Sequence, residues 1–117
     1  MTEIKDMNNF EVHPDNEVTI VFRKIMREGH TIVKKVDTVP VTPIKDEIVQ
    51  YYEIKTGAIY EGNIKIRIIS EHARWGQILQ WKDEEEKWVD RTLSCLKVGK
   101  YKLITGVTDR LSWFGIR

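Results

Sequence analysis

The residues of this chain that could carry out nucleophilic or metal chemistry are few and far apart. Its three histidines have no mutual spacing typical of metal ligands; they are His13, His30 and His72. The single cysteine, Cys95, cannot form a thiolate cluster, and its neighbours Leu93 and Leu96 favour a buried, inert thiol. These residues therefore indicate neither a metal site nor a catalytic nucleophile.

Carboxylates are concentrated in the run Asp83-Glu84-Glu85-Glu86, which has enough charge to hold a hard cation. The run lacks the alternating carboxylates and the glycine of a calcium-binding loop, so we expect a solvated turn whose charge discourages strand-edge pairing. The sequence contains no Gly-x-Ser-x-Gly nucleophile motif, phosphate-binding loop or Gly-x-Gly-x-x-Gly motif. We therefore expect no catalytic residue, no metal and no cofactor, and we predict that the protein is not an enzyme.

The composition is typical of one globular domain. The 117 residues are 41% hydrophobic and 32% charged, which is enough for both a core and a soluble surface. The 19 basic and 18 acidic residues give a formal net charge of +1. This balance removes the usual electrostatic argument for a nucleic-acid-binding protein.

Cysteine content and hydropathy indicate the compartment. One cysteine cannot form an intramolecular disulfide, which fits a reducing environment. No apolar run is long enough for a transmembrane helix, and the polar start at residues 1–6 has no hydrophobic signal-peptide region. We expect a cytoplasmic protein that has no membrane partner.

The N-terminal third is predicted to contain an arm and a hairpin. Residues 1–16 lack periodicity and are expected to be a flexible or docked arm, whereas residues 17–117 form a single β-rich domain. Residues 17–26 and 31–39 are rich in β-formers and flank a glycine turn at residues 27–30. This pattern predicts a β-hairpin.

A helix is predicted over residues 43–55. Thr42 is a suitable N-cap and Pro43 a suitable first helical residue. The apolar positions that follow have helical spacing; they are Ile44, Ile48, Tyr51 and Tyr52. The alternative is a strand over Ile48–Ile54, which the β-prone tyrosines favour.

Short strands and turns alternate after Gly57. We expect a turn at residues 61–63, a strand at 64–69, a hairpin of 74–82 and 87–93 closed by the acidic run, and a turn at 98–100 before strands at 101–105 and 111–116. The predicted fold class is therefore β-rich α+β. It would be a small barrel or a strongly bent antiparallel sheet, with an N-terminal hairpin and one short helix at about residues 43–55.

All four tryptophans fall within the last 43 residues. Tryptophan often anchors a binding surface, but a small barrel also needs large side chains to fill its interior. We expect at least two of the four to be core residues. The candidate surface anchors are Trp75 or Trp113 with Phe114, and the candidate basic neighbours are Arg74 and Arg110.

Basic residues cluster in three places along the chain. The clusters are Arg23, Lys24 and Arg27; Lys34 and Lys35; and Lys97, Lys100 and Lys102. The first two clusters flank the predicted hairpin turn, and together with Arg74 and exposed aromatic rings they could grip single-stranded nucleic acid. An ordinary solvated surface is the favoured interpretation because the net charge is so small.

Three segments carry a resemblance to a known family. They are Gln50-Tyr51, Gly57-Ala58-Ile59-Tyr60-Glu61-Gly62-Asn63-Ile64 and Gly76-Gln77-Ile78-Leu79-Gln80-Trp81. Over about residues 50–92 the chain resembles the YopX-type proteins of phages and prophages, although Asn63 stands where that family has aspartate. The family has no established activity to carry over. The resemblance implies a phage or prophage accessory protein in the host cytoplasm.

These observations lead to two functional hypotheses. The first is a non-enzymatic intracellular binding module that inhibits or modulates a host factor by protein–protein interaction, with the protein partner unidentified. The alternative is a nucleic-acid-binding small β-barrel that uses a local basic and aromatic face. The oligomeric state is left open.

Overall fold

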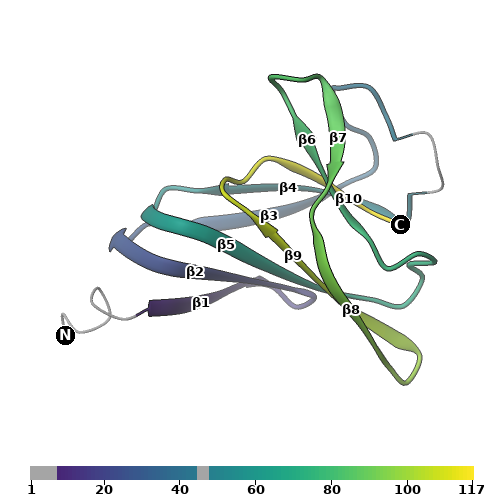
Figure 1. The fold of residues 1–117 in the computed structure, drawn as a ribbon, viewed down its shortest axis with the longest axis horizontal. Coiled ribbons are helices and arrows are strands. Elements are labelled where there is room, and N and C mark those ends of the chain that lie inside the picture. The colour runs from purple at the N-terminus through teal and green to yellow at the C-terminus, as the bar shows by residue number, and fades with distance from the viewer. Residues whose placement is uncertain (1–7, 45–47) are drawn as a thin grey trace.

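The computed structural model describes residues 8–44 and 48–117, which form ten β-strands in two five-stranded antiparallel sheets (Figure 1). Sheet A contains, in spatial order, β1 (Asn8–Asp15), β2 (Val18–Arg27), β5 (Ile59–Ser70), β9 (Tyr101–Thr108) and β8 (Thr92–Val98). Sheet B contains, in spatial order, β3 (Thr31–Val36), β4 (Gln50–Thr56), β10 (Trp113–Ile116), β6 (Ile78–Lys82) and β7 (Lys87–Asp90).

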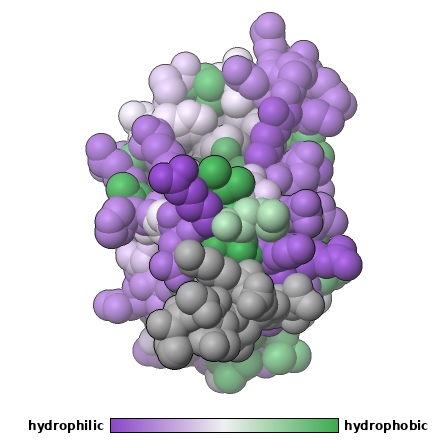
Figure 2. Space-filling view, turned by 90° about the vertical axis from the view of Figure 1, so that its left-hand side faces the viewer, coloured by the Kyte–Doolittle hydropathy of each residue, from purple (hydrophilic) through white to green (hydrophobic). Residues whose placement is uncertain are grey.

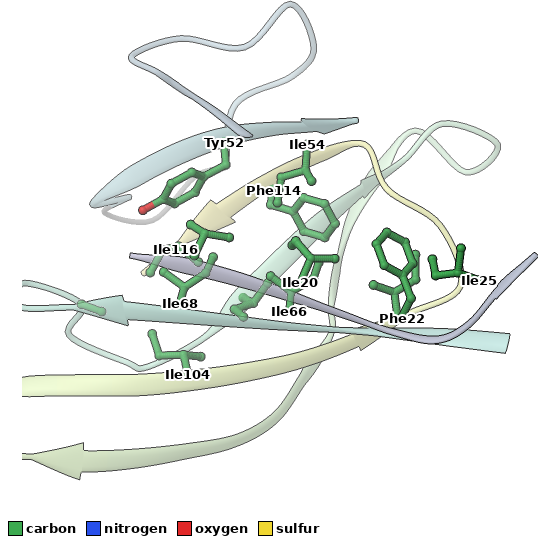
Figure 3. Close-up of a cluster of buried hydrophobic side chains, with 14 residues drawn as sticks. Ile20, Phe22, Ile25, Tyr52, Ile54, Ile66, Ile68, Ile104, Phe114 and Ile116 are labelled. Atoms are coloured by element: carbon green, nitrogen blue, oxygen red, sulfur yellow. The ribbon is translucent and has the colours of Figure 1, made fainter. Parts of the chain in front are cut away.

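The two sheets face each other across one hydrophobic core (Figure 3). The β-rich prediction is confirmed, but the strands do not close into a barrel: over residues 8–44 and 48–117 they form two separate sheets, each with an edge strand at either side. Both sheets contribute buried side chains to this core, among them Ile20, Phe22, Ile66, Ile68 and Ile104 from sheet A and Tyr52, Ile54, Ile78, Phe114 and Ile116 from sheet B. The described residues include no helix that is long and apolar enough to cross a membrane.

Strict alternation makes β5 the clearest strand in the sequence. Ile64, Ile66 and Ile68 are buried against sheet B, whereas Lys65 is exposed and Arg67 half-buried on the opposite face. This arrangement follows from the two-residue period of a strand, which turns successive side chains to opposite faces. The predicted strand at 64–69 is therefore confirmed within a longer element.

The helix predicted over residues 43–55 is wrong. Residues 50–56 form β4, so the alternative strand is the observed structure, while residues 45–47 lie outside the described part of the chain. In β4, Tyr52 and Ile54 are buried in the core and Tyr51 lies on the outer face of sheet B. Ile44 lies near Tyr51 without a helix between them: its backbone N–H donates to the Tyr51 hydroxyl at 3.1 Å.

The hairpin predicted from residues 17–26 and 31–39 is also wrong. β2 pairs with β1 and β5 in sheet A, whereas β3 pairs with β4 in sheet B. The connection at Gly29 carries the chain from one sheet to the other, and a Cβ at Gly29 would lie 2.4 Å from the carbonyl carbon of Gly57. The N-terminal hairpin that does form joins β1 to β2, so residues 8–15 are an edge strand of sheet A.

The turn predicted at residues 61–63 is instead a bulge inside β5. Phe22 pairs with Ile64 and Lys24 pairs with Glu61, so two residues of β5 oppose Arg23. Gly62 has a φ of +86°, a conformation that favours glycine. Local turn chemistry was therefore correctly located, but the strand continues through it.

The tryptophan hairpin is confirmed as β6 and β7, joined by the acidic turn. Both strands are shorter than predicted. β6 begins at Ile78, which leaves Trp75 outside it, and the chain leaves sheet B after Asp90 and enters sheet A at Thr92. The predicted strand at 101–105 extends through Gly106 to Thr108 as β9. A Cβ at Gly106 would lie 3.2 Å from the Ile78 side chain, so the glycine permits close packing of the two sheets.

Burial of Tyr52 predicts a loss of stability at alkaline pH. Desolvation, with the nearby carboxylates of Glu17 and Asp15, raises the pKa of the phenol well above its usual range. The unfolded chain therefore releases this proton first, and stability falls by up to about 1.4 kcal/mol per pH unit above about pH 10. Below that pH the phenol is neutral in both states and has no such effect.

Tyr52→Phe removes this titration. Urea unfolding between pH 8 and about 11 should show a shallower alkaline decline in the variant than in the wild type. Parallel declines would show that Tyr52 ionises equally well in the folded chain.

Candidate functional site

The four tryptophans occupy three different environments. Trp81 is buried, Trp88 and Trp113 are half-buried, and Trp75 is 67% exposed. Trp75 is thus the one tryptophan whose ring is mostly available to a partner.

The outer face of sheet B uses its aromatic rings for packing within the chain. Trp88 contacts Trp81 and Tyr51, with ring centroids 5.6 and 5.7 Å apart, and its indole Nε1 donates to the Thr42 carbonyl at 2.7 Å. Ile44 lies close above Gly115 on the same face. A cavity of about 430 Å³ remains between the segment at 42–44 and these rings. The cluster thus holds a connecting segment on the sheet.

The second predicted anchor group is divided between the core and a surface cleft. Phe114 is 0% exposed and belongs to the core, so its assignment as a surface anchor is corrected. Trp113 is half-buried beside Tyr60 and Leu111 in a cleft of about 350 Å³. Arg110 donates to Glu84 of the acidic turn, and this contact holds the pKa of the Glu84 carboxyl below its usual range.

The basic residues of the first two clusters are divided between the sheets. Arg23, Lys24 and Arg27 belong to β2 in sheet A, whereas Lys34 and Lys35 belong to β3 in sheet B. Lys35 donates to Glu17 at 2.6 Å, and Lys24 lies 3.8 Å from Glu61. Figure 2 shows the end of the molecule at which β2 ends and β5 begins, where hydrophilic side chains lie on both sides of a small apolar area.

The hairpin of β8 and β9 carries the third cluster and projects from the body of the sandwich (Figure 1). It turns at Gly99, whose φ is +61°, so the predicted turn at 98–100 is confirmed. β8 is an edge strand of seven residues, and six of them are exposed. Within the described residues, β8 pairs with β9 alone.

An apolar stripe crosses the outer face of this hairpin. Leu103 pairs with Leu96 of β8 on one side and with Ile69 of β5 on the other. The adjacent cross-strand pair, Val98 and Tyr101, extends the stripe toward the turn. Leu96 is 61% exposed and Val98 is 55% exposed, so this surface is open to solvent. Exposed apolar surface that is contiguous in this way marks an interaction site in many soluble proteins.

The opposite face of the hairpin is basic. Lys97 and Lys102 are direct cross-strand partners, and Lys100 lies in the turn. Lys102 donates to the Ala73 carbonyl at 2.7 Å, and Lys100 lies 3.5 Å from Glu71. No side-chain partner of Lys97 occurs in the described ranges 8–44 and 48–117. The segment from Thr92 to Thr108 contains no acidic residue.

Trp75 borders the same strand. The next residue, Gly76, has a φ of +70°, and a Cβ there would lie 2.5 Å from the Cys95 Sγ and close to Lys102. The loop that carries Arg74 and Trp75 therefore packs against the basic face of β8. Cys95 itself is exposed, which corrects the expectation of a buried thiol.

A buried polar network positions β8 at the point where the chain changes sheets. Gln80 is 2% exposed; its amide accepts from Arg91 Nε and Thr108 Oγ1 and donates to the Arg110 carbonyl and Ser112 Oγ. The Arg91 backbone N–H donates to Ile78 in sheet B, and its carbonyl accepts from Val107 in sheet A. The residue immediately before β8 is thus tied to both sheets.

The fold and this surface define an antiparallel β-sandwich with one exposed apolar edge strand. No family model, curated protein or solved structure matches the chain. The YopX-type resemblance therefore stays a prediction.

The sequence pattern predicted Trp75 and Arg74 as contact residues. It marked Lys97, Lys100 and Lys102 only as a basic cluster, and it did not point to Leu96, Val98 and Tyr101. The absence of acidic residues from Thr92 to Thr108 was the available signal.

Proposed function

We propose that this protein is a non-enzymatic binding module that captures an extended segment of a protein partner along β8. The mode would be strand addition, in which backbone hydrogen bonds supply affinity and alternate side chains supply specificity. An intracellular role as a phage or prophage modulator of a host factor is part of the proposal, and its support is the sequence resemblance alone.

The observation that carries the proposal is that, among the described strands, β8 has less of the protection found at the other three edges. β7 has only four residues, β1 contains Pro14 and a register shift, and β3 carries Lys34 and Lys35 side by side. Short length, proline, bulges and charge are the usual means by which edges avoid pairing with other chains. β8 has seven residues, no proline and exposed leucines. It too carries a lysine, and its register shift is confined to its start, between Thr92 and Ser94.

The surroundings of β8 suit a partner strand. In an antiparallel pair, alternate residues direct N–H and C=O groups away from their neighbour, so an edge strand offers a row of unused donors and acceptors. Leu96 and Val98 flank this row on one face, and the loop of Trp75 flanks it on the other. Aromatic residues at such positions often contribute most of the binding energy.

Selection of peptides from a random octapeptide library tests the proposal. The full chain should enrich extended peptides, and Leu96→Asn should weaken their binding by about fivefold to tenfold, because one apolar contact of about 1 kcal/mol or more is lost. Fluorescence anisotropy with labelled selected peptides gives the affinity.

Ile32→Asn is the matched control. Ile32 lies on edge strand β3 and is 60% exposed, against 61% for Leu96, so it tests whether any apolar edge suffices. Equal losses in both variants, or no loss in either, would contradict binding at β8. A single-stranded oligonucleotide that bound in about 50 mM salt and was released at higher salt would instead support the nucleic-acid alternative.

A further inference from the structure

We infer that the segment bound along β8 is acidic, with carboxylates alternating with apolar side chains, an inference that rests on the proposed function. The structural basis is that the two faces of the hairpin differ in character. Lys97 and Lys102 lie on one face, while Leu96, Val98 and Tyr101 lie on the other. A strand added to the edge of β8 would continue both faces.

The positive charge of this hairpin is unusual for a chain that is almost neutral. The segment Thr92–Thr108 holds three lysines and no acidic residue, although the whole chain has 18 acidic residues and a net charge of +1. Glu71 lies 3.5 Å from Lys100 and offsets its charge, but Lys102 contacts a backbone carbonyl and Lys97 has no acidic partner among the described residues. An uncompensated charge of this kind steers a partner of opposite charge.

Lys97 of β8 and Lys102 of β9 lie directly opposite one another. Like charges directly opposite one another on two strands repel and destabilise the pair. A carboxylate on the neighbouring position of an added strand would lie beside Lys97 and relieve this repulsion. Because side chains alternate along a strand, the residues on either side of that carboxylate would face Leu96 and Val98.

A second copy of the chain fits this edge less well. Pairing β8 with itself would bring three further lysines to a surface where Glu71 is already paired with Lys100. The acidic turn of a second copy is largely engaged, because Arg110 binds Glu84 and two lysines, Lys82 and Lys87, hold the pKa of Glu85 to about 2. The charges therefore favour a different chain that has free carboxylates.

An anionic membrane surface would attract the lysines, but it would not supply hydrogen-bond partners for the open edge of β8. The open edge of β8 lies between the basic face and the apolar stripe, so contact with lipid would bury its unused backbone donors and acceptors without partners. Each such group costs free energy when it is removed from water unpaired. A peptide backbone satisfies these groups, which makes a protein segment the better occupant.

Three synthetic octapeptides that alternate leucine with glutamate, glutamine or lysine test the inference. The glutamate peptide should bind the wild-type chain about tenfold more tightly than the glutamine peptide, and the lysine peptide most weakly, because each exposed charge pair changes affinity a few-fold. The preference should shrink as salt is raised. The double variant Lys97→Glu/Lys100→Glu should reverse the order of the glutamate and lysine peptides.

Lys34→Glu/Lys55→Glu is the control, since it makes the same charge change on exposed residues of sheet B. Equal binding of glutamate and glutamine peptides that still depends on Leu96 would overturn the acidic partner and leave the proposed function intact. Absence of any Leu96-dependent peptide binding would overturn both. A dimer that Leu96→Asn dissociates in light scattering, or Lys97-dependent binding to phosphatidylserine vesicles without peptide binding, would also overturn the inference.

Discussion

Replacing Phe114 by alanine is expected to lower the free energy of unfolding by about 3–5 kcal/mol. The ring is 0% exposed and lies between the two sheets (Figure 3). It belongs to β10, which pairs with both β4 and β6, so a cavity there would face the centre of sheet B. A loss of this size is a large share of the 5–15 kcal/mol that typically stabilises a domain.

Urea unfolding followed by circular dichroism checks this prediction. Phe114→Leu should lose clearly less than the alanine variant because it leaves a smaller cavity. Trp75→Ala should change stability by no more than about 0.5 kcal/mol, since that ring is mostly in solvent. Similar losses at positions 75 and 114 would contradict the assignment of one ring to the surface and the other to the core.

Gln80→Leu is expected to cost about 3 kcal/mol although leucine is similar in size and more apolar. The substitution leaves Arg91 Nε without its acceptor in a largely buried site and removes one of two hydrogen bonds from Thr108 Oγ1 and from the Arg110 carbonyl, which still bond to each other at 2.9 Å. A buried donor or acceptor that loses its partner costs about 1–3 kcal/mol, and partial access to water limits the sum. Because Arg91 precedes β8, this variant should also loosen the binding surface.

Two measurements separate these effects. A double-mutant cycle with Thr108→Val should show that the losses are not additive, because Thr108 and Gln80 share a hydrogen bond of 2.6 Å. Gln80→Leu should increase the rate of amide hydrogen exchange more in β8 and β9 than in β1 and β2. Additive losses with uniform exchange would show that Gln80 stabilises the fold without positioning β8.

Local pattern was sufficient for the elements whose neighbours in sequence are also neighbours in space. The hairpin of β6 and β7 and the turn at Gly99 were located because strand pairing there is local. The alternation in β5 was visible because one of its faces is buried and the other is not. Exposure of Trp75 was predicted as one of two options.

Non-local pairing overrode the local signals elsewhere. Residues 50–56 have apolar spacing compatible with a helix, but Tyr52 and Ile54 are held in β4 by neighbours from β3 and β10. The two strands around Gly29 have the pattern of a hairpin, yet they do not pair with each other: β2 pairs with β1 and β5, and β3 pairs with β4. Single-residue patterns carry little information about such pairings, because the sheet to which a strand belongs depends on distant segments.

The sequence by itself determined the β-rich class, the alternation that builds the core, the near-neutral net charge and the basic stretch at Lys97–Lys102. Only the tertiary structure decided that β8 is an edge, that Leu96 and Val98 form one stripe with Leu103, and that Phe114 is buried. The physical reason is that the periodicity of side chains is a local property of the sequence. Which strand lies at an edge, and which side chains are buried, depends on the spatial order of the strands in the two sheets. The candidate binding surface exists because β8 lies at the edge of sheet A.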